Sequence, residues 1–157
     1  RDLVRSRGLG DVYKRQILND EGIAEYYVPE GKWTDIITGK VLEGGKWYKH
    51  KCSYFEIPAL AKPNSIIAYG NFERQIEYDY LEGTTFTIYE LEDGKSAVCP
   101  IYDTEANKVF ELTATRHGNK IECEYTDTKA SFKITVANTD KTVEIAPNFS
   151  GKVIIEL

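Results

Sequence analysis

The chain has 157 residues, which is enough for one ordinary domain or two small ones. Hydrophobic residues make up 41% and charged residues 29% of it, a balance that excludes a disordered chain. The net charge of -5 disfavours a nucleic-acid partner held through phosphates, and no apolar run approaches the roughly 18 residues of a membrane-spanning helix. We therefore expect neither nucleic acid nor a membrane as a partner. Aromatic residues, at 12%, favour β structure because their rings pack well on a pleated surface.

Residues 1–16 differ in composition from the rest of the chain. They carry five Lys or Arg against two Asp, a balance of +3 that leaves -8 for the remainder. A basic nucleic-acid arm or a transit peptide is one interpretation. We prefer a translated sequencing-adapter tail, to which the letters GLGDVYKRQ point, and expect disorder or an arbitrary local helix there. The chain has no methionine, so we expect a fragment, a processed product or an open-ended reading frame.

From Ile17 onward the pattern is one of short strands separated by turns. Turn residues recur at Pro29-Glu30-Gly31, Gly39, Gly44-Gly45 and Lys62-Pro63-Asn64, where proline presets φ and glycine permits left-handed backbone. The strands expected between these turns are Ile23–Val28, Trp33–Thr38, Lys40–Leu42, Lys46–Cys52, Phe55–Leu60 and Ser65–Tyr69.

The composition shifts between Asn71 and Glu82, where three Glu and one Asp accompany a single β-branched residue. We interpret this stretch as a solvated connection between two units. The alternative is a carboxylate pair for metal or acid–base chemistry, which would need a pocket and a partner that the sequence does not show.

After Gly83 the strands follow at the spacing typical of a sandwich. Lys120–Tyr125 alternates, with Ile121, Cys123 and Tyr125 on one face and Glu122 and Glu124 on the other. No segment has a 3.6-residue period. The other strands expected here are Thr84–Leu91, Lys95–Tyr102, Val109–Thr115, Ser131–Ala137, Thr142–Ala146 and Lys152–Leu157.

These patterns predict an all-β fold of two small antiparallel β-sandwich units. We place the first at residues 17–75, truncated at its start, and the second at residues 76–157. A missing strand would leave an unpaired edge in the first unit, which would favour aggregation or a homo-oligomer.

The three cysteines, Cys52, Cys99 and Cys123, fit neither a disulfide framework nor a zinc motif. Reduced thiols in a cytoplasmic protein are the preferred interpretation. A single Cys99–Cys123 disulfide is the alternative.

No catalytic or cofactor motif stands out in the sequence, and we expect no catalytic residue, cofactor or metal. A catalytic triad would need His50 or His117 as its base. His117 lies in a glycine-containing turn, and His50 lies between Lys49 and Lys51, whose charges disfavour a protonated imidazole. We interpret both as surface histidines.

Trp33 and Trp47 support two interpretations. Aromatic faces stack on the apolar faces of pyranose rings, so the two residues could form a carbohydrate contact in a stand-alone binding module. Large aromatic side chains more often fill a core, and both could instead pack in the first unit.

The stretch from Tyr26 to Gly70 resembles the region that follows the catalytic barrel in glycoside hydrolase family 31. The resemblance rests on Tyr26-Tyr27-Val28-Pro29-Glu30-Gly31-Lys32-Trp33, then Gly44-Gly45-Lys46-Trp47 and Lys62-Pro63-Asn64-Ser65-Ile66-Ile67, with Val28 where leucine is commoner. The second half is similar to the distal C-terminal domain of bacterial α-xylosidases, through Gly83-Thr84-Thr85-Phe86, Asp93-Gly94, Ala97-Val98-Cys99 and Thr115-Arg116-His117-Gly118-Asn119.

The resemblance implies a parent enzyme, an α-xylosidase or α-glucosidase, that hydrolyses α-linked sugars with retention. Its two catalytic aspartates lie on a (β/α)8 barrel that is absent here, so Asp35 and Asp79 inherit neither role. The fragment would be inactive alone and would support that barrel through a hydrophobic face including Trp33 or Trp47.

Overall fold

The structure is a computed structural model that describes residues 12–14, 23–51, 59–70, 81–103, 105–126, 128–147 and 151–157. Every regular element in these ranges is a β-strand, so the expected all-β fold class is confirmed. No helix in the described part is long and apolar enough to span a bilayer. The chain divides into two compact units between Pro63 and Asn64, and each unit is described by itself.

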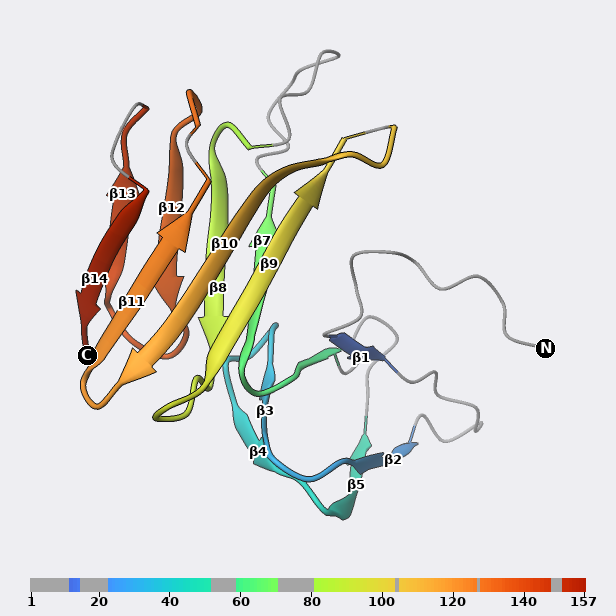
Figure 1. Ribbon diagram of the computed structural model, residues 1–157. Coiled ribbons are helices and arrows are strands. Elements are labelled where there is room, and N and C mark those ends of the chain that lie inside the picture. The colour runs from blue at the N-terminus through green and yellow to red at the C-terminus, as the bar shows by residue number, and fades with distance from the viewer. Residues whose placement is uncertain are drawn as a thin grey trace. The chain divides into compact units, whose positions relative to one another are not determined.

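The first unit combines a four-stranded sheet with a two-stranded one. The larger sheet has the order β1-β6-β3-β4 and the smaller pairs β2 with β5, and every pairing is antiparallel (Figure 1). The bounds are β1 Val12–Lys14, β2 Ile23–Val28, β3 Lys32–Asp35, β4 Val41–Glu43, β5 Lys46–Lys51 and β6 Ala59–Ala61.

Strand β1 departs from the expectation for residues 1–16. Its backbone pairs with β6, with Val12 opposite Ala61 and Lys14 opposite Ala59. The expectation of disorder or an arbitrary helix is therefore wrong at these residues. A three-residue strand satisfies its backbone groups through the ladder of a neighbour, whatever its composition.

The core of the first unit lies between its two sheets. Tyr26 and Val28 enter it from β2, and residues from the larger sheet complete it, namely Trp33, Leu42 and Leu60. The alternation of β2 explains this arrangement, because Tyr26 and Val28 are buried while Glu25 and Tyr27 point outward.

The second unit is a sandwich of two four-stranded sheets (Figure 1). One sheet has the order β14-β11-β10-β9 and the other β13-β12-β8-β7. The bounds are β7 Ser65–Tyr69, β8 Thr84–Tyr89, β9 Ser96–Tyr102, β10 Lys108–His117, β11 Lys120–Tyr125, β12 Phe132–Val136, β13 Thr142–Ile145 and β14 Lys152–Glu156. One pairing departs from the antiparallel expectation, since β8 and β12 run parallel with Phe86 beside Ile134.

Strand β7 belongs to the second unit, although the expected boundary lay between residues 75 and 76. It pairs antiparallel with β8, and Ile66 opposite Ile88 is 3% exposed in the second core. The boundary between the two units in the chain therefore precedes β7.

Aromatic rings from both sheets meet in the core of the sandwich. Phe86 and Phe132 come from one sheet, and Phe110 and Tyr125 come from the other. Ring centroids lie 5.3 Å apart for Phe110 and Phe132 and 5.2 Å apart for Tyr125 and Phe132, both edge to face. Tyr125 reaches this core through the alternation of apolar residues along β11 that the sequence predicts.

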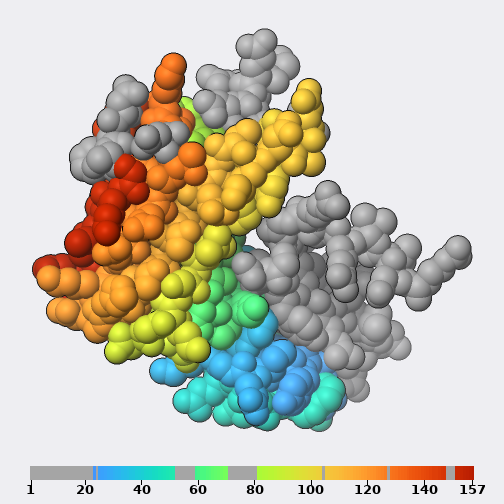
Figure 2. All heavy atoms as spheres, in the orientation of Figure 1, coloured from blue at the N-terminus to red at the C-terminus, as the bar shows by residue number. Residues whose placement is uncertain are grey.

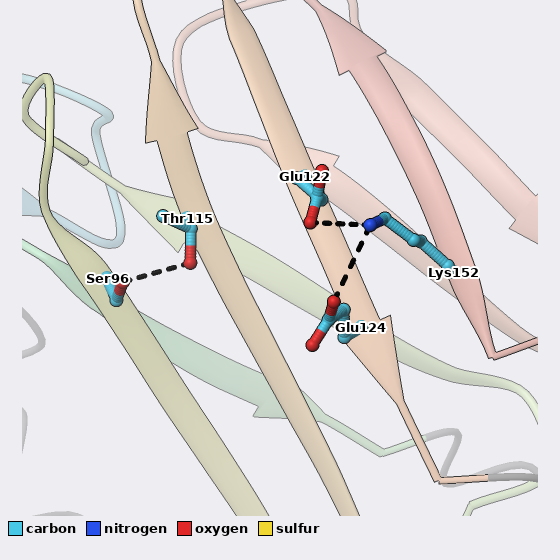
Figure 3. Close-up of polar contacts among 5 residues, drawn as sticks. All are labelled: Ser96, Thr115, Glu122, Glu124 and Lys152. Atoms are coloured by element: carbon cyan, nitrogen blue, oxygen red, sulfur yellow. Dashed lines mark hydrogen bonds and ion pairs between the residues drawn. The ribbon is translucent and has the colours of Figure 1, made fainter.

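The outer face of sheet β14-β11-β10-β9 carries charged and hydroxyl side chains together with the exposed residues Val98, Tyr102 and Ile154. Figure 2 shows these strands in yellow, orange and red, without a deep hollow. The hydroxyl oxygens of Ser96 and Thr115 are hydrogen-bonded at 2.9 Å (Figure 3). Lys152 Nζ lies 2.8 Å from Glu122 Oε1 and 3.7 Å from Glu124 Oε1. Hydrogen bonding from Lys152 holds the pKa of Glu122 below its ordinary value. These pairs are exposed, so we interpret the face as solvated surface.

Candidate functional site

Trp33 is a core residue. Its side chain is 8% exposed and packs with Tyr26, Val28, Leu42 and Leu60. Its indole Nε1 donates a hydrogen bond of 2.9 Å to the carbonyl oxygen of Pro29, so the polar end of the ring is also satisfied. The ring therefore offers no face to a ligand or another domain.

The two turn motifs of the first unit pack on each other. Gly44 N donates to Gly31 O and Gly45 N donates to Val28 O, each at 2.7 Å. A β-carbon on Gly44 would lie 1.6 Å from Pro29 O, so only glycine fits there. The packed turns fix where β5 begins and hence where Trp47 lies.

Trp47 lies on the outer face of the two-stranded sheet and is 61% exposed. Its cross-strand partner is Tyr27, which is 39% exposed. The ring centroids lie 5.7 Å apart and the ring planes meet at 61°. We call Tyr27 and Trp47 the aromatic corner.

Charged residues continue the same outer face. Glu25 lies opposite Lys49, with Oε1 and Nζ 3.5 Å apart, and Ile23 lies opposite Lys51. Both charged groups of the ion pair stay largely in solvent, with side-chain exposures of 54% and 72%. Sequence reasoning singled out Trp47 but missed Tyr27. The period-2 pattern of Ile23–Val28, aligned against Lys46–Lys51, would have found it.

The histidines and aspartates assemble no catalytic constellation in the described residues. His50 and His117 are exposed, as expected of surface histidines. Asp35 accepts hydrogen bonds from Ile37 N at 2.9 Å and Thr38 N at 3.2 Å, which close the turn after β3. Asp79 lies outside the described residues. No three His, Cys, Asp or Glu side chains in the described ranges cluster as metal ligands would.

The cysteines of the second unit are buried thiols with no disulfide between them. The preferred interpretation of reduced cysteines is confirmed for Cys99 and Cys123. Burial raises the pKa of Cys123 to about 12, so its reactive thiolate form is scarce near neutral pH. Cys52 lies outside the described residues.

The Thr115-Arg116-His117-Gly118-Asn119 turn of the second unit is also structural. Arg116 donates from Nη1 to Leu91 O at 2.9 Å and from Nε to Gly118 O at 2.7 Å. Asp93 accepts a hydrogen bond of 2.7 Å from Gly118 N. These contacts join the loop after β8 to the hairpin between β10 and β11.

Two family models match the chain. The model described as the glycosyl hydrolase family 31 C-terminal domain matches residues 12–67. The model described as the C-terminal domain of the α-xylosidase YicI matches residues 79–157.

Curated relatives match over short parts of their own length. The α-xylosidase XylQ of Lactiplantibacillus pentosus is 31% identical over 108 residues, which is 67% of this chain and 14% of the relative. α-Glucosidase 2 of Bacillus thermoamyloliquefaciens is 37% identical over 79 residues, which is 50% of this chain and 10% of the relative. This chain thus spans a small share of each.

Solved structures share the fold. The cycloalternan-forming enzyme of Listeria monocytogenes, in complex with a pentasaccharide substrate, has a TM-score of 0.73 at 17% identity, covering 94% of this chain and 18% of the enzyme. The family 31 α-xylosidase of Xanthomonas citri has a TM-score of 0.63 at 14% identity, covering 88% of this chain and 18% of the enzyme. These likenesses show the fold alone.

Proposed function

This chain belongs to glycoside hydrolase family 31 as part of its C-terminal region, and from that premise we propose that it is the non-catalytic β-sandwich portion of a retaining α-glycosidase. Its role is to support a (β/α)8 catalytic barrel. The observation that carries the proposal is the pair of C-terminal domain matches, at residues 12–67 and 79–157, in a chain that spans only 14% of the α-xylosidase XylQ.

The site geometry is consistent with a supporting role. Asp35 is committed to a turn, and His50 and His117 are both exposed strand residues. Each unit has its own core, so each can present a formed surface to another domain. Trp33 is excluded from that contact because its ring is buried.

We favour an α-xylosidase as the parent over an α-glucosidase. The model that matches residues 79–157 describes an α-xylosidase domain, and the relative with the longer match is an α-xylosidase. α-Glucosidase 2, at 37% identity over 79 residues, supports the alternative.

The test combines this chain with a relative that lacks the matching segment. XylQ truncated before that segment is assayed for hydrolysis of chromogenic α-xyloside and α-glucoside, and its thermal midpoint is measured, with and without this chain. We expect no hydrolysis by this chain alone and a higher midpoint of the truncated enzyme in its presence. The XylQ segment itself, added in trans, is the positive control. Hydrolysis by this chain alone would overturn the non-catalytic role.

A carbohydrate-binding module acting alone is the second candidate, favoured by the exposure of Trp47. It predicts saccharide binding with no effect of this chain on the truncated enzyme. The same experiment separates the two, since only a supporting domain raises the thermal midpoint.

A further inference from the structure

The aromatic corner is an exposed apolar feature set among charged residues. Trp47 is 61% exposed although the first unit buries its other tryptophan to 8%. Burying an indole ring is favourable, because it removes a large apolar surface from water. A tryptophan left in solvent beside a second aromatic ring therefore indicates a partner that covers both.

The size and surroundings of the corner fit a small ligand better than a protein. Its outward neighbours Glu25, Lys49 and Lys51 are all charged. The centre of a protein interface is depleted in Lys and Glu, and contacts between domains bury at least about 600 Å². Two rings flanked by charges provide much less apolar surface than that.

The polar groups beside the corner supply hydrogen bonds suited to sugar hydroxyls. Glu25 offers carboxylate acceptors and Lys49 offers ammonium donors. Glu25 Oε1 and Lys49 Nζ lie 3.5 Å apart, so hydrogen-bond acceptors and donors lie side by side on β2 and β5. An aromatic face with a few polar groups at its rim is the usual composition of a small-molecule site.

We propose that the aromatic corner binds one pyranose ring of a neutral oligosaccharide. The apolar face of the sugar stacks on Trp47, the edge of Tyr27 contacts its side, and its hydroxyls bond to Glu25 and Lys49. The angle of 61° between the rings makes a corner and excludes a flat platform across several sugar residues. The ligand class is therefore a soluble oligosaccharide or a chain end, and not a crystalline polysaccharide surface. This inference does not rest on the proposed support of a barrel.

The test is a titration of the full chain with xyloglucan oligosaccharides and with maltotriose, followed by NMR of the two indole N–H groups. We expect the Trp47 indole signal to move saturably, with a dissociation constant on the order of 1 mM, because two exposed rings give few contacts. The Trp33 signal is an internal reference, since its Nε1 is bonded to Pro29 O inside the core.

Matched variants assign the site. Trp47→Ala should weaken binding about tenfold or more, by loss of the stacked ring, and Tyr27→Ala should weaken it less. Tyr102→Ala is the control, because Tyr102 is 52% exposed but belongs to the second unit. Unchanged thermal midpoints of the variants would show that they remain folded.

Two outcomes would overturn the proposal. One is the absence of saturable shifts with either oligosaccharide class. The other is binding that survives in Trp47→Ala at the strength of the unmodified chain. If Trp47→Ala instead abolished only the stabilisation of truncated XylQ by this chain, the corner would be a domain contact and the sugar-site proposal would fail.

Discussion

Asn64 and Glu92 hold each other through two reciprocal hydrogen bonds. Asn64 Nδ2 donates to Glu92 Oε2 at 3.0 Å, and Glu92 N donates to Asn64 Oδ1 at 2.8 Å. Asn64 has a φ of 56°, a left-handed conformation that asparagine tolerates better than most residues. The pair ties the first residue of the second unit to the loop after β8.

Replacing Asn64 should therefore destabilise the second unit. We expect Asn64→Gly, which keeps the left-handed backbone but loses the side chain, to lower the free energy of unfolding by about 1–2 kcal/mol. Asn138→Gly is the matched control, because Asn138 has a φ of 59° in an exposed turn. Denaturant titrations measure both. Equal effects of the two substitutions would contradict a role for the Glu92 contacts.

Gly44 should be intolerant of any side chain. A β-carbon there would collide with Pro29 O at 1.6 Å, and this atom belongs to backbone that also accepts the Trp33 indole bond. We expect Gly44→Ala to cost about 3 kcal/mol or more through overpacking. Gly94→Ala should cost only about 1 kcal/mol, because Gly94 has a positive φ of 73° but open space around it. Thermal unfolding of the two variants compares them, and similar losses would be inconsistent with packed turns.

Thr34→Val should stabilise the first unit. Thr34 is 1% exposed, and its hydroxyl has no hydrogen-bond partner among the residues that the structure describes. Removing a buried unsatisfied hydroxyl should raise the free energy of unfolding by about 1 kcal/mol. Thr84 is also 1% exposed, but its hydroxyl is not among the buried side-chain groups without a hydrogen-bond partner, so Thr84→Val should be destabilising. Chemical denaturation tests the opposite signs, and destabilisation by both would refute this account of Thr34.

Glu82 should contribute to the loss of stability in acid. Its Oε1 accepts from Ser131 Oγ at 2.5 Å and its Oε2 accepts from Ser131 N at 2.8 Å. The hydroxyl bond first, and then the backbone bond, lowers the pKa of Glu82 below its ordinary value. A folded pKa below the unfolded one stabilises the protein above the ordinary glutamate pKa of about 4.3, and this contribution disappears as pH falls through the folded pKa.

The corresponding variant is Glu82→Gln. It should be less stable than the unmodified chain at neutral pH, and the difference should shrink in acid. Ser131→Ala, which keeps the backbone donor, should show a smaller version of the same trend. Thermal midpoints between pH 3 and pH 7 measure the effect, roughly spanning the glutamate titration. A difference that is constant with pH would contradict the assignment.

Much of the fold follows from local pattern. Ile23–Val28, Ser65–Tyr69 and Lys120–Tyr125 are strands with the predicted bounds, because turn residues and alternation define both ends. The parallel pairing of β8 with β12 could not be predicted in this way. The pairing depends on which distant strand lies next to β8 in the sheet, and the alternation within a strand does not identify its neighbour.

Only one of the two residues of the candidate site, Trp47, could be predicted from the sequence. Trp33 and Trp47 follow similar turns, but Trp33 faces the core and Trp47 faces outward. Alternation along a strand shows which residues share a face. It does not show which of the two faces a second sheet covers. The partner Tyr27 becomes visible only once β2 and β5 are aligned.

The measurement that tests the account most directly is made on a chimera in which residues 12–157 of this chain, which include β1, replace the matching segment of XylQ. Its hydrolysis of an α-xyloside and its thermal midpoint are compared with those of XylQ truncated before that segment. A C-terminal portion that supports the barrel should restore both activity and stability toward those of intact XylQ. A chimera that folds in both units of the replaced segment, yet is no more active or stable than the truncated enzyme, would contradict the proposed function.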